Sequence, residues 1–151
     1  NSSTVGIGAP ICLESYQNSL VSCNNDLFNS NLIRVNGSGF NRSTTIISQD
    51  SDNQLPSIRR NVRASAIDED GNKIFLVNSV GNLLEIDLNS GFRTQINLGE
   101  APTGASIGTS GLAFEPEKKV LYWAGGMTGF QSILIIDPQS GHSVVLSGRS
   151  L

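Results

Sequence analysis

The residues that could carry chemistry in this chain are few, and they form no recognised catalytic set. The sequence holds one histidine, His142, which directly follows the turn glycine Gly141. Acyl transfer by a serine nucleophile needs a histidine base beside that serine and a third group that orients the base. No strand–turn–helix motif for such a nucleophile accompanies the histidine. We therefore expect His142 to be a solvated turn residue, and we predict no catalytic residues.

One acidic segment, Asp68-Glu69-Asp70-Gly71-Asn72, superficially resembles a calcium-binding loop. Carboxylate and amide oxygens suit this hard cation, but the standard loop needs glycine at its sixth position and a bidentate glutamate at its twelfth. Here the glycine is fourth and the twelfth residue is Ser79. The segment is instead typical of a hairpin turn. Glu14 and Glu115 match Asp68 in two further repeats, which favours turn-stabilising acceptors over one unique site.

Two cysteines, Cys12 and Cys23, lie on the first two expected strands. A hairpin that turns at Gln17-Asn18 places residue 12 opposite residue 23, at a Cα separation of about 4.5–5.5 Å. A disulfide across that pair is geometrically allowed. The alternative is two small buried thiols that pack as hydrophobic residues. A spacing of ten intervening residues suits no metal site.

Short strands must position these residues. The stretch ASAIDEDGNKIFLVNSVGNLLEIDLNSGFRTQINLG, Ala64–Gly99, contains four apolar runs that are separated by turn residues such as Asp70-Gly71 and Ser90-Gly91. Glycine at such turns supplies the positive φ angles of tight hairpins. The run Leu83–Leu88 alternates with period two, which is the period of a half-buried strand. The stretch therefore predicts a meander of four antiparallel strands.

Similar text lies on both sides of this stretch. ILIIDPQSG at 133–141 matches LLEIDLNSG at 83–91, and NLIRVNGSGF at 31–40 matches 82–92 more faintly. The turn glycines Gly39, Gly91 and Gly141 are 52 and 50 residues apart, a period in the range of propeller blades. We therefore predict an all-β fold, a β-propeller fragment of three four-stranded antiparallel blades. The repeats lie at about 10–48, 64–99 and 110–148 of a single partial propeller that spans 1–151.

The composition excludes several classes of protein. The chain has 151 residues, 38% of them hydrophobic and 15% charged, with 10 Lys plus Arg and a net charge of −3. A globular domain fits these values, and no stripe of positive charge is offered to a nucleic acid. The apolar runs are far shorter than the roughly 20 residues that cross a bilayer. Because the chain begins at Asn1 and not at methionine, we expect a piece of a longer or processed protein.

The repeat text resembles a known superfamily. "LLEIDLNSGFRTQI" and "ILIIDPQSGHSVVLSG", preceded by "SAIDEDGNKIFLVNS" and "GLAFEPEKKVLYWAGG", are similar to blades of six-bladed propellers of the SMP-30/gluconolactonase-like and NHL/YWTD-like kind. The resemblance covers nearly the whole chain, and its motifs form blades. Lactonases, receptor modules and proteins of no known activity share these motifs. It implies about half of a six-bladed ring, which the remaining blades or a second copy would close.

The resemblance also implies where a metal would bind. Lactonases of the SMP-30 kind hold a divalent metal in the central channel through oxygen ligands, which include asparagine and acidic side chains. The matching column here is Asn24, Asn78 and Ala124, at the inner end of each second strand. Two of the three blades thus offer an amide oxygen, so Asn24 and Asn78 are the metal-ligand candidates. The alternative is that both asparagines are ordinary turn residues.

Two functional hypotheses follow. The first is a non-catalytic binding module that presents the propeller rim to a protein or a carbohydrate, with no cofactor. The second is a calcium-dependent lactonase or esterase of the gluconolactonase type. A calcium requirement separates them, and we leave open whether the chain is catalytic. The allowed disulfide, with few lysines and many Asn and Ser residues, favours a periplasmic or extracellular protein. Neither the ligand nor the total number of blades follows from the sequence.

Overall fold

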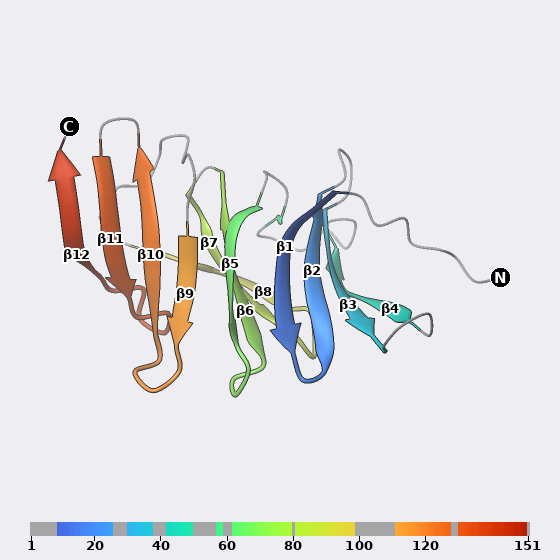
Figure 1. Cartoon of the computed structure of the whole chain (residues 1–151). Coiled ribbons are helices and arrows are strands. Elements are labelled where there is room, and N and C mark those ends of the chain that lie inside the picture. Colours follow the sequence, from blue (N-terminus) through green and yellow to red (C-terminus); the bar gives the residue numbers. More distant parts are fainter. Residues whose placement is uncertain are drawn as a thin grey trace.

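The protein is described here by a computed structural model, which places residues 9–25, 30–37, 42–49, 57–58, 62–79, 81–98, 111–127 and 130–150. Within these ranges the fold is all-β, with three four-stranded antiparallel sheets (Figure 1). Each sheet is a meander whose strands pair in chain order. The predicted fold class is therefore confirmed. We call the sheets blades 1, 2 and 3.

Twelve strands form these blades in the described residues. Blade 1 consists of β1 (Ala9–Tyr16), β2 (Ser19–Asn25), β3 (Ser30–Asn36) and β4 (Ser43–Gln49). Blade 2 consists of β5 (Val62–Asp68), β6 (Lys73–Asn78), β7 (Leu83–Asp87) and β8 (Arg93–Ile96). Blade 3 consists of β9 (Gly111–Glu115), β10 (Val120–Met127), β11 (Phe130–Ile136) and β12 (Ser143–Ser150).

The blades stack face to face, and their first strands lie side by side. Strand β1 contacts β5, and β5 contacts β9, so one edge of each blade meets at a common side (Figure 1). The last strands, β4, β8 and β12, form the opposite edges of the three sheets. This is the arrangement that the period of about 50 residues predicts for propeller blades.

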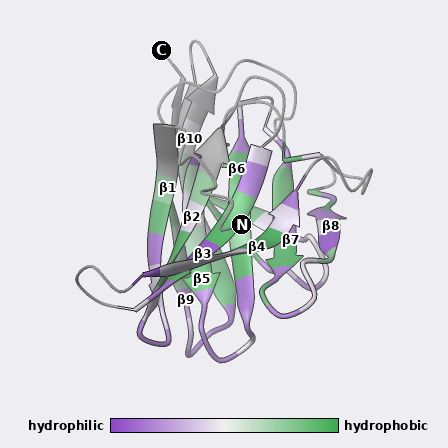
Figure 2. Ribbon diagram, turned by 90° about the vertical axis from the view of Figure 1, so that its right-hand side faces the viewer, coloured by the Kyte–Doolittle hydropathy of each residue, from purple (hydrophilic) through white to green (hydrophobic). Residues whose placement is uncertain are grey.

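The hydrophobic core lies between the blades and is divided into two layers. Alternate residues of a strand face opposite sides of its sheet, so blade 2 supplies both layers. Its residues Ile74 and Leu76 pack against blade 1, while Phe75 and Val77 pack against blade 3. All four side chains are buried. Figure 2 shows the hydrophobic residues within the strands and the hydrophilic residues at the hairpin turns.

Each internal contact between blades includes a turn glycine. Gly91 has φ +74°, and a Cβ built on it would lie 2.0 Å from the carbonyl oxygen of Ile47, in the last strand of blade 1. Gly141 has φ +73°, and its Cβ would lie 2.1 Å from the carbonyl oxygen of Asn97, directly after β8 of blade 2. Only glycine combines this conformation with so close an approach. The turn of one blade is thus pressed against the backbone of the blade before it.

Buried polar groups connect blades 1 and 2 at the same place. The Nε of Arg93 donates a hydrogen bond of 2.7 Å to Ser48 Oγ, and that hydroxyl donates one of 2.8 Å to the carbonyl of Gly91. Both Arg93 and Ser48 are buried. Hydrogen bonds of this kind compensate for the loss of water at buried polar atoms. They also fix the position of the blade 2 turn relative to β4.

We predict that Gly141→Ala destabilises the protein strongly. The alanine would have to adopt a positive φ and its Cβ would overlap the Asn97 carbonyl, so we expect a loss of about 1–3 kcal/mol in the free energy of unfolding. Urea unfolding followed by circular dichroism measures this change. Gly111→Ala is the matched control, because a Cβ at Gly111 meets no atom within 4 Å. Equal stability of the two variants would contradict the proposed role of the turn.

Candidate binding groove

A groove of about 380 Å³ lies between blades 2 and 3. Blade 2 supplies Lys73 from β6, Glu85 from β7, and residues 94–97 from β8 and its end. Blade 3 supplies residues 138–141, the turn that precedes β12. The groove exists because this turn lies against the outer part of blade 2. It is therefore formed by two repeats together.

An ion pair forms one part of the groove wall. Lys73 Nζ lies 2.8 Å from Glu85 Oε1, and the two side chains are 37% and 21% exposed. Glu85 is paired with Thr94 in the register of β7 and β8, so the side chains of these two residues lie on the same face of blade 2. Lys73 lines the same groove. A partly exposed pair of this kind contributes little to stability. It does present both a cation and an anion to a molecule in the groove.

Four further polar side chains of the groove are available for a ligand. Thr94, Gln95, Asn97 and Gln139 are exposed, and their side chains make no hydrogen bond within the part of the chain that the structure describes. An amide side chain offers both donors and acceptors, and a hydroxyl offers one donor and two lone pairs. The groove is therefore suited to a neutral polar ligand with many hydrogen-bonding groups.

Asp137 shapes the turn on the blade 3 side of the groove. Its Oδ1 accepts a 2.9 Å hydrogen bond from the backbone N–H of Gln139, and its Oδ2 accepts one of 2.6 Å from Ser140 Oγ. These hydrogen bonds hold the pKa of Asp137 below its ordinary value of 3.8, and the bond from the Ser140 hydroxyl is the main cause. The carboxylate of Asp137 therefore stabilises the turn, and both of its oxygens accept hydrogen bonds from residues of that turn.

Asp87 plays the same part in blade 2. Its Oδ1 accepts hydrogen bonds from the backbone N–H groups of Asn89 and Ser90, at 3.0 and 2.7 Å, and from Ser90 Oγ at 2.8 Å. The Ser90 backbone bond is the main cause of a pKa that lies below the ordinary 3.8. The shared Asp-x-x-Ser-Gly sequence thus encodes one turn geometry twice. In each of the two blades, the glycine that ends this sequence is the one that approaches the preceding blade.

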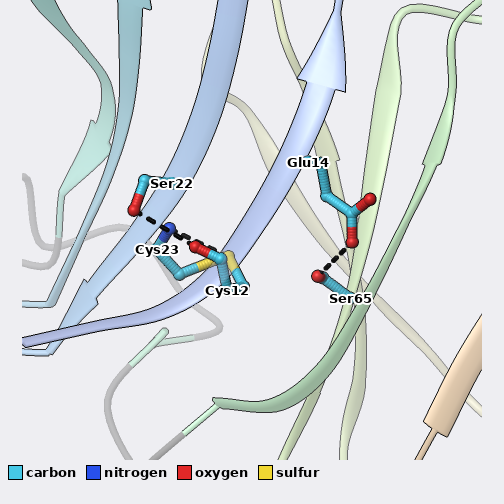
Figure 3. Close-up of a disulfide and its surroundings, with 5 residues drawn as sticks. All are labelled: Cys12, Glu14, Ser22, Cys23 and Ser65. Atoms are coloured by element: carbon cyan, nitrogen blue, oxygen red, sulfur yellow. Dashed lines mark hydrogen bonds between the residues drawn. A yellow bond between two sulfur atoms is a disulfide. The ribbon is translucent and has the colours of Figure 1, made fainter.

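The two cysteines are joined by a disulfide in the structure. Cys12 is paired with Cys23 in the register of β1 and β2, with their Cα atoms 5.0 Å apart. Both residues are buried. Ser22 Oγ donates a hydrogen bond of 3.1 Å to the Cys12 carbonyl (Figure 3). This cross-link lies within blade 1, on the face that packs against blade 2.

The register corrects the expected equivalence of three acidic residues. The last pairs before the first hairpin turn of each blade are Tyr16–Ser19, Asp68–Lys73 and Glu115–Val120. Glu14 therefore does not correspond to Asp68. Its Oε1 instead accepts a hydrogen bond of 2.5 Å from Ser65 Oγ of blade 2 (Figure 3). The sequence alignment matched Glu14 with Asp68 because it did not allow for the different turn lengths. The first hairpin has a two-residue turn, and the other two have four-residue turns.

Asp68 stabilises its own turn and also contacts the next blade. Its Oδ1 accepts a hydrogen bond of 3.0 Å from the backbone N–H of Gly71 and lies 3.4 Å from Lys119 Nζ of blade 3. The acidic segment is thus a hairpin turn, as its spacing indicates. No group of three or more His, Cys, Asp or Glu side chains gathers around a metal-sized site in the described ranges.

Asn78 lies at the end of β6 and is buried. Its Oδ1 accepts a hydrogen bond of 3.0 Å from the backbone N–H of Asn82, which supports the tight connection to β7. The side chain of Asn24 lies outside the described part of the structure. A calcium site at Asn24 and Asn78 therefore stays a prediction. His142 is exposed in the turn before β12, where its backbone N–H donates to Ser140 Oγ at 3.2 Å.

Comparison with known proteins supports the fold. No protein-family model matches the sequence, and no curated protein matches it. Among solved structures, one chain of a nidogen/laminin complex is 14% identical, with a TM-score of 0.68 over 97% of this chain and 51% of that one. A protein of unknown function from Bacteroides thetaiotaomicron VPI-5482 is 16% identical, with a TM-score of 0.59. That match covers 85% of this chain and 30% of the other.

These likenesses support a β-propeller-like fold for this chain, whose blades are the three four-stranded sheets. The chain spans about half the length of the first similar structure and less than a third of the second. In the described ranges, we find no helix with the length and apolar character to cross a bilayer.

We predict that the two aspartate turns make the protein sensitive to acid. Each folded-state pKa lies below the ordinary 3.8, so the stabilisation is present above that pH and is lost as the pH falls through the folded-state value. Between about pH 5 and 2, the melting temperature of the wild type should fall more than that of Asp87→Asn/Asp137→Asn. Thermal unfolding by circular dichroism measures this, with the exposed Glu117→Gln as a control. Parallel curves for the wild type and the double variant would contradict the assignment.

Proposed function

We propose that this protein is a non-catalytic interaction module that binds an extended segment of a partner protein in the groove between blades 2 and 3. The observation that carries the proposal is the set of unbonded polar side chains in that groove. Thr94, Asn97 and Gln139 lie around one concave site, and their side chains make no hydrogen bond to the residues that the structure describes. Their side-chain donors and acceptors are therefore available to a partner.

The groove suits a peptide segment because of the strand beside it. Strand β8 is the last strand of blade 2, so its outer edge pairs with no strand in the described structure. An exposed edge offers backbone N–H and C=O groups to an extended chain, and neighbouring side chains then add selectivity. The Lys73–Glu85 pair beside this edge supplies a cation and an anion for polar side chains of the partner. The similar chain in a nidogen/laminin complex supports the choice of a protein partner.

The finer classification is also a proposal. The repeat text supports a six-bladed propeller of the SMP-30/gluconolactonase-like or NHL/YWTD-like kind, of which this chain provides three blades. The disulfide supports export to the periplasm or the extracellular space, because such bonds persist in oxidising compartments. A carbohydrate is the other rim ligand that the sequence suggests. We favour the peptide, because none of the described residues that line the groove is an aromatic one that could stack against a sugar ring.

We predict that peptides selected against this chain bind through the groove. A phage-displayed random peptide library is the probe, and calorimetry measures the affinity of the selected peptides. Thr94→Arg places a long side chain in the groove and should weaken binding more than tenfold. Gln139→Ala removes one amide and should weaken it about threefold to tenfold. Thr45→Arg should change affinity less than twofold.

Thr45 is the matched control because it occupies the same register position in blade 1. It is paired with Arg34 on β3, as Thr94 is paired with Glu85 on β7, and both threonines are exposed. Peptides that bind Thr94→Arg as tightly as the wild type would refute the groove as the site. Failure to select any peptide, with glycans retained on a glycan array, would favour a carbohydrate partner and contradict the proposal.

A further inference from the structure

The third strands of blades 1 and 2 carry two residues that correspond in position but differ in charge. Arg34 of β3 is paired with Thr45 of β4, and Glu85 of β7 is paired with Thr94 of β8. Their partners on the other side also correspond, because these are the third residues of β2 and β6, Val21 and Phe75. Arg34 contacts Leu88 of the next blade, and Glu85 lines the groove beside the next blade. The two blade interfaces can therefore be compared residue by residue.

At the interface between blades 1 and 2, the arginine connects the two blades. Arg34 Nη2 donates a hydrogen bond of 3.1 Å to the carbonyl of Leu88, the residue that follows the turn aspartate of blade 2. The guanidinium carbon lies 4.9 Å from the centre of the Tyr16 ring, at the end of β1. An aromatic face and a carbonyl oxygen are both favourable partners for a guanidinium. One arginine thus fills the space between the third strand of a blade and the turn of the next blade.

At the interface between blades 2 and 3, no arginine lies in this place in the described structure. Glu85 replaces Arg34, and Pro138 follows the turn aspartate of blade 3 as Leu88 follows that of blade 2. The carbonyl of Pro138 receives no hydrogen bond from the residues that the structure describes. Glu85 and Pro138 both line the groove. The groove is therefore found where a guanidinium fills the first interface.

The charges beside the groove favour a cation. Lys73 Nζ lies 2.8 Å from Glu85 Oε1, and Lys73 is also paired with Asp87 in the register of β6 and β7. Two carboxylates therefore share one lysine, and this corner of blade 2 carries a net negative charge. A carboxylate has about four lone-pair sites, so the contact with Lys73 leaves Glu85 able to accept a further donor.

We propose that the groove binds an arginine side chain of the partner segment, with its guanidinium between the carboxylate of Glu85 and the carbonyl of Pro138. This arginine site rests on the proposed function, and it names the residue that the bound segment must carry. A guanidinium offers five N–H donors in a planar fork, which can serve a carboxylate and a carbonyl at once. The arginine of the partner then makes at the second interface the contact that Arg34 makes at the first.

An extended segment on the outer edge of β8 brings such a side chain within reach. A segment residue opposite Thr94 has its side chain on the same face of the sheet as Thr94 and Glu85. Its backbone is then two strand spacings, about 9.5 Å, from that of Glu85. Arg34 covers the same number of strand spacings inside this chain, from β3 to the end of β1. An arginine therefore has the length that the site requires.

Peptide selection followed by matched synthetic peptides tests this site. From the phage library selected against the wild-type chain, we expect groove-binding peptides that share one arginine. Replacement of that arginine by citrulline keeps its shape but removes its charge, and should weaken binding roughly tenfold or more in calorimetry. Replacement by lysine keeps the charge but lacks the planar fork, and should weaken binding about threefold to tenfold.

Variants of the protein show whether Glu85 contacts the arginine directly. Glu85→Gln should weaken the arginine peptide roughly tenfold and leave the citrulline peptide within about twofold. Lys73→Met/Glu85→Gln removes one charge of each sign, so the local net charge is unchanged, and the arginine peptide should still bind roughly tenfold more weakly. Glu117→Gln is the matched control, because it removes an exposed carboxylate that does not line the groove. Circular dichroism verifies that each variant is folded.

A second double variant should close the groove from inside the chain. Lys73 is the first residue of β6, and its counterpart at the start of β2 is Ser19. Lys73→Ser/Glu85→Arg therefore gives blade 2 the pair of residues that blade 1 has at these positions. The introduced arginine should donate to the Pro138 carbonyl and occupy the site, so that every selected peptide binds roughly tenfold more weakly while the melting temperature is maintained.

Peptides that lose affinity for Thr94→Arg but share no arginine would overturn the arginine site and leave the proposed function intact. Arginine peptides that bind Glu85→Gln or Lys73→Ser/Glu85→Arg as tightly as the wild type would overturn it equally. Selected peptides that depend on a carboxylate of their own would assign the groove to Lys73 and contradict the site. If no peptide binds at all, the proposed function fails and the arginine site fails with it.

Discussion

The backbone of each preceding blade sets the position of the next one in this protein. Gly91 and Gly141 lie in identical Asp-x-x-Ser-Gly turns, and each approaches a main-chain carbonyl of the blade before it more closely than any side chain would allow. Burial of apolar side chains provides the driving force for stacking, but it is not directional. The turn supplies the direction, because its aspartate fixes the loop and its glycine fixes the distance. Stacking and turn geometry together make a repeated sequence into an ordered array.

The groove is a consequence of that same contact. The turn of blade 3 that presses on Asn97 also presents Gln139 to the outer edge of blade 2. A substitution that moves the turn would therefore change both stability and the shape of the groove. The equivalent turn of blade 2 is held by Arg93 and Ser48 through buried hydrogen bonds. The two interfaces thus share a close approach of a turn glycine to the preceding backbone and differ in the side chains around it.

The sequence predicted what is local and periodic. Alternation in 83–88 and the Asp-Gly and Ser-Gly turns indicated strands and hairpins, and the spacing of Gly91 and Gly141 indicated the blades; the three sheets confirm this fold class. The alignment of Glu14 with Asp68 was wrong, because a two-residue turn shifts the first repeat relative to the others. The groove was not predicted either. Thr94, Gln95 and Gln139 are ordinary surface residues in the sequence, and only the seating of one blade on another brings them together. The roles of Asn24 and Asn78 toward a metal stay a prediction.

Native-state hydrogen exchange tests the central claim, that contacts between blades hold the structure together, most directly. Strands β6 and β7 belong to blade 2, which packs against blade 1 on one face and against blade 3 on the other, with Ile74, Leu76 and Leu84 at most 1% exposed. Their amides should therefore exchange only through global unfolding, while those of β12 exchange through local opening of lower free energy. Equal protection of β6, β7 and β12, or stronger protection of β12, would contradict the account, because each blade would then be stable without its neighbours.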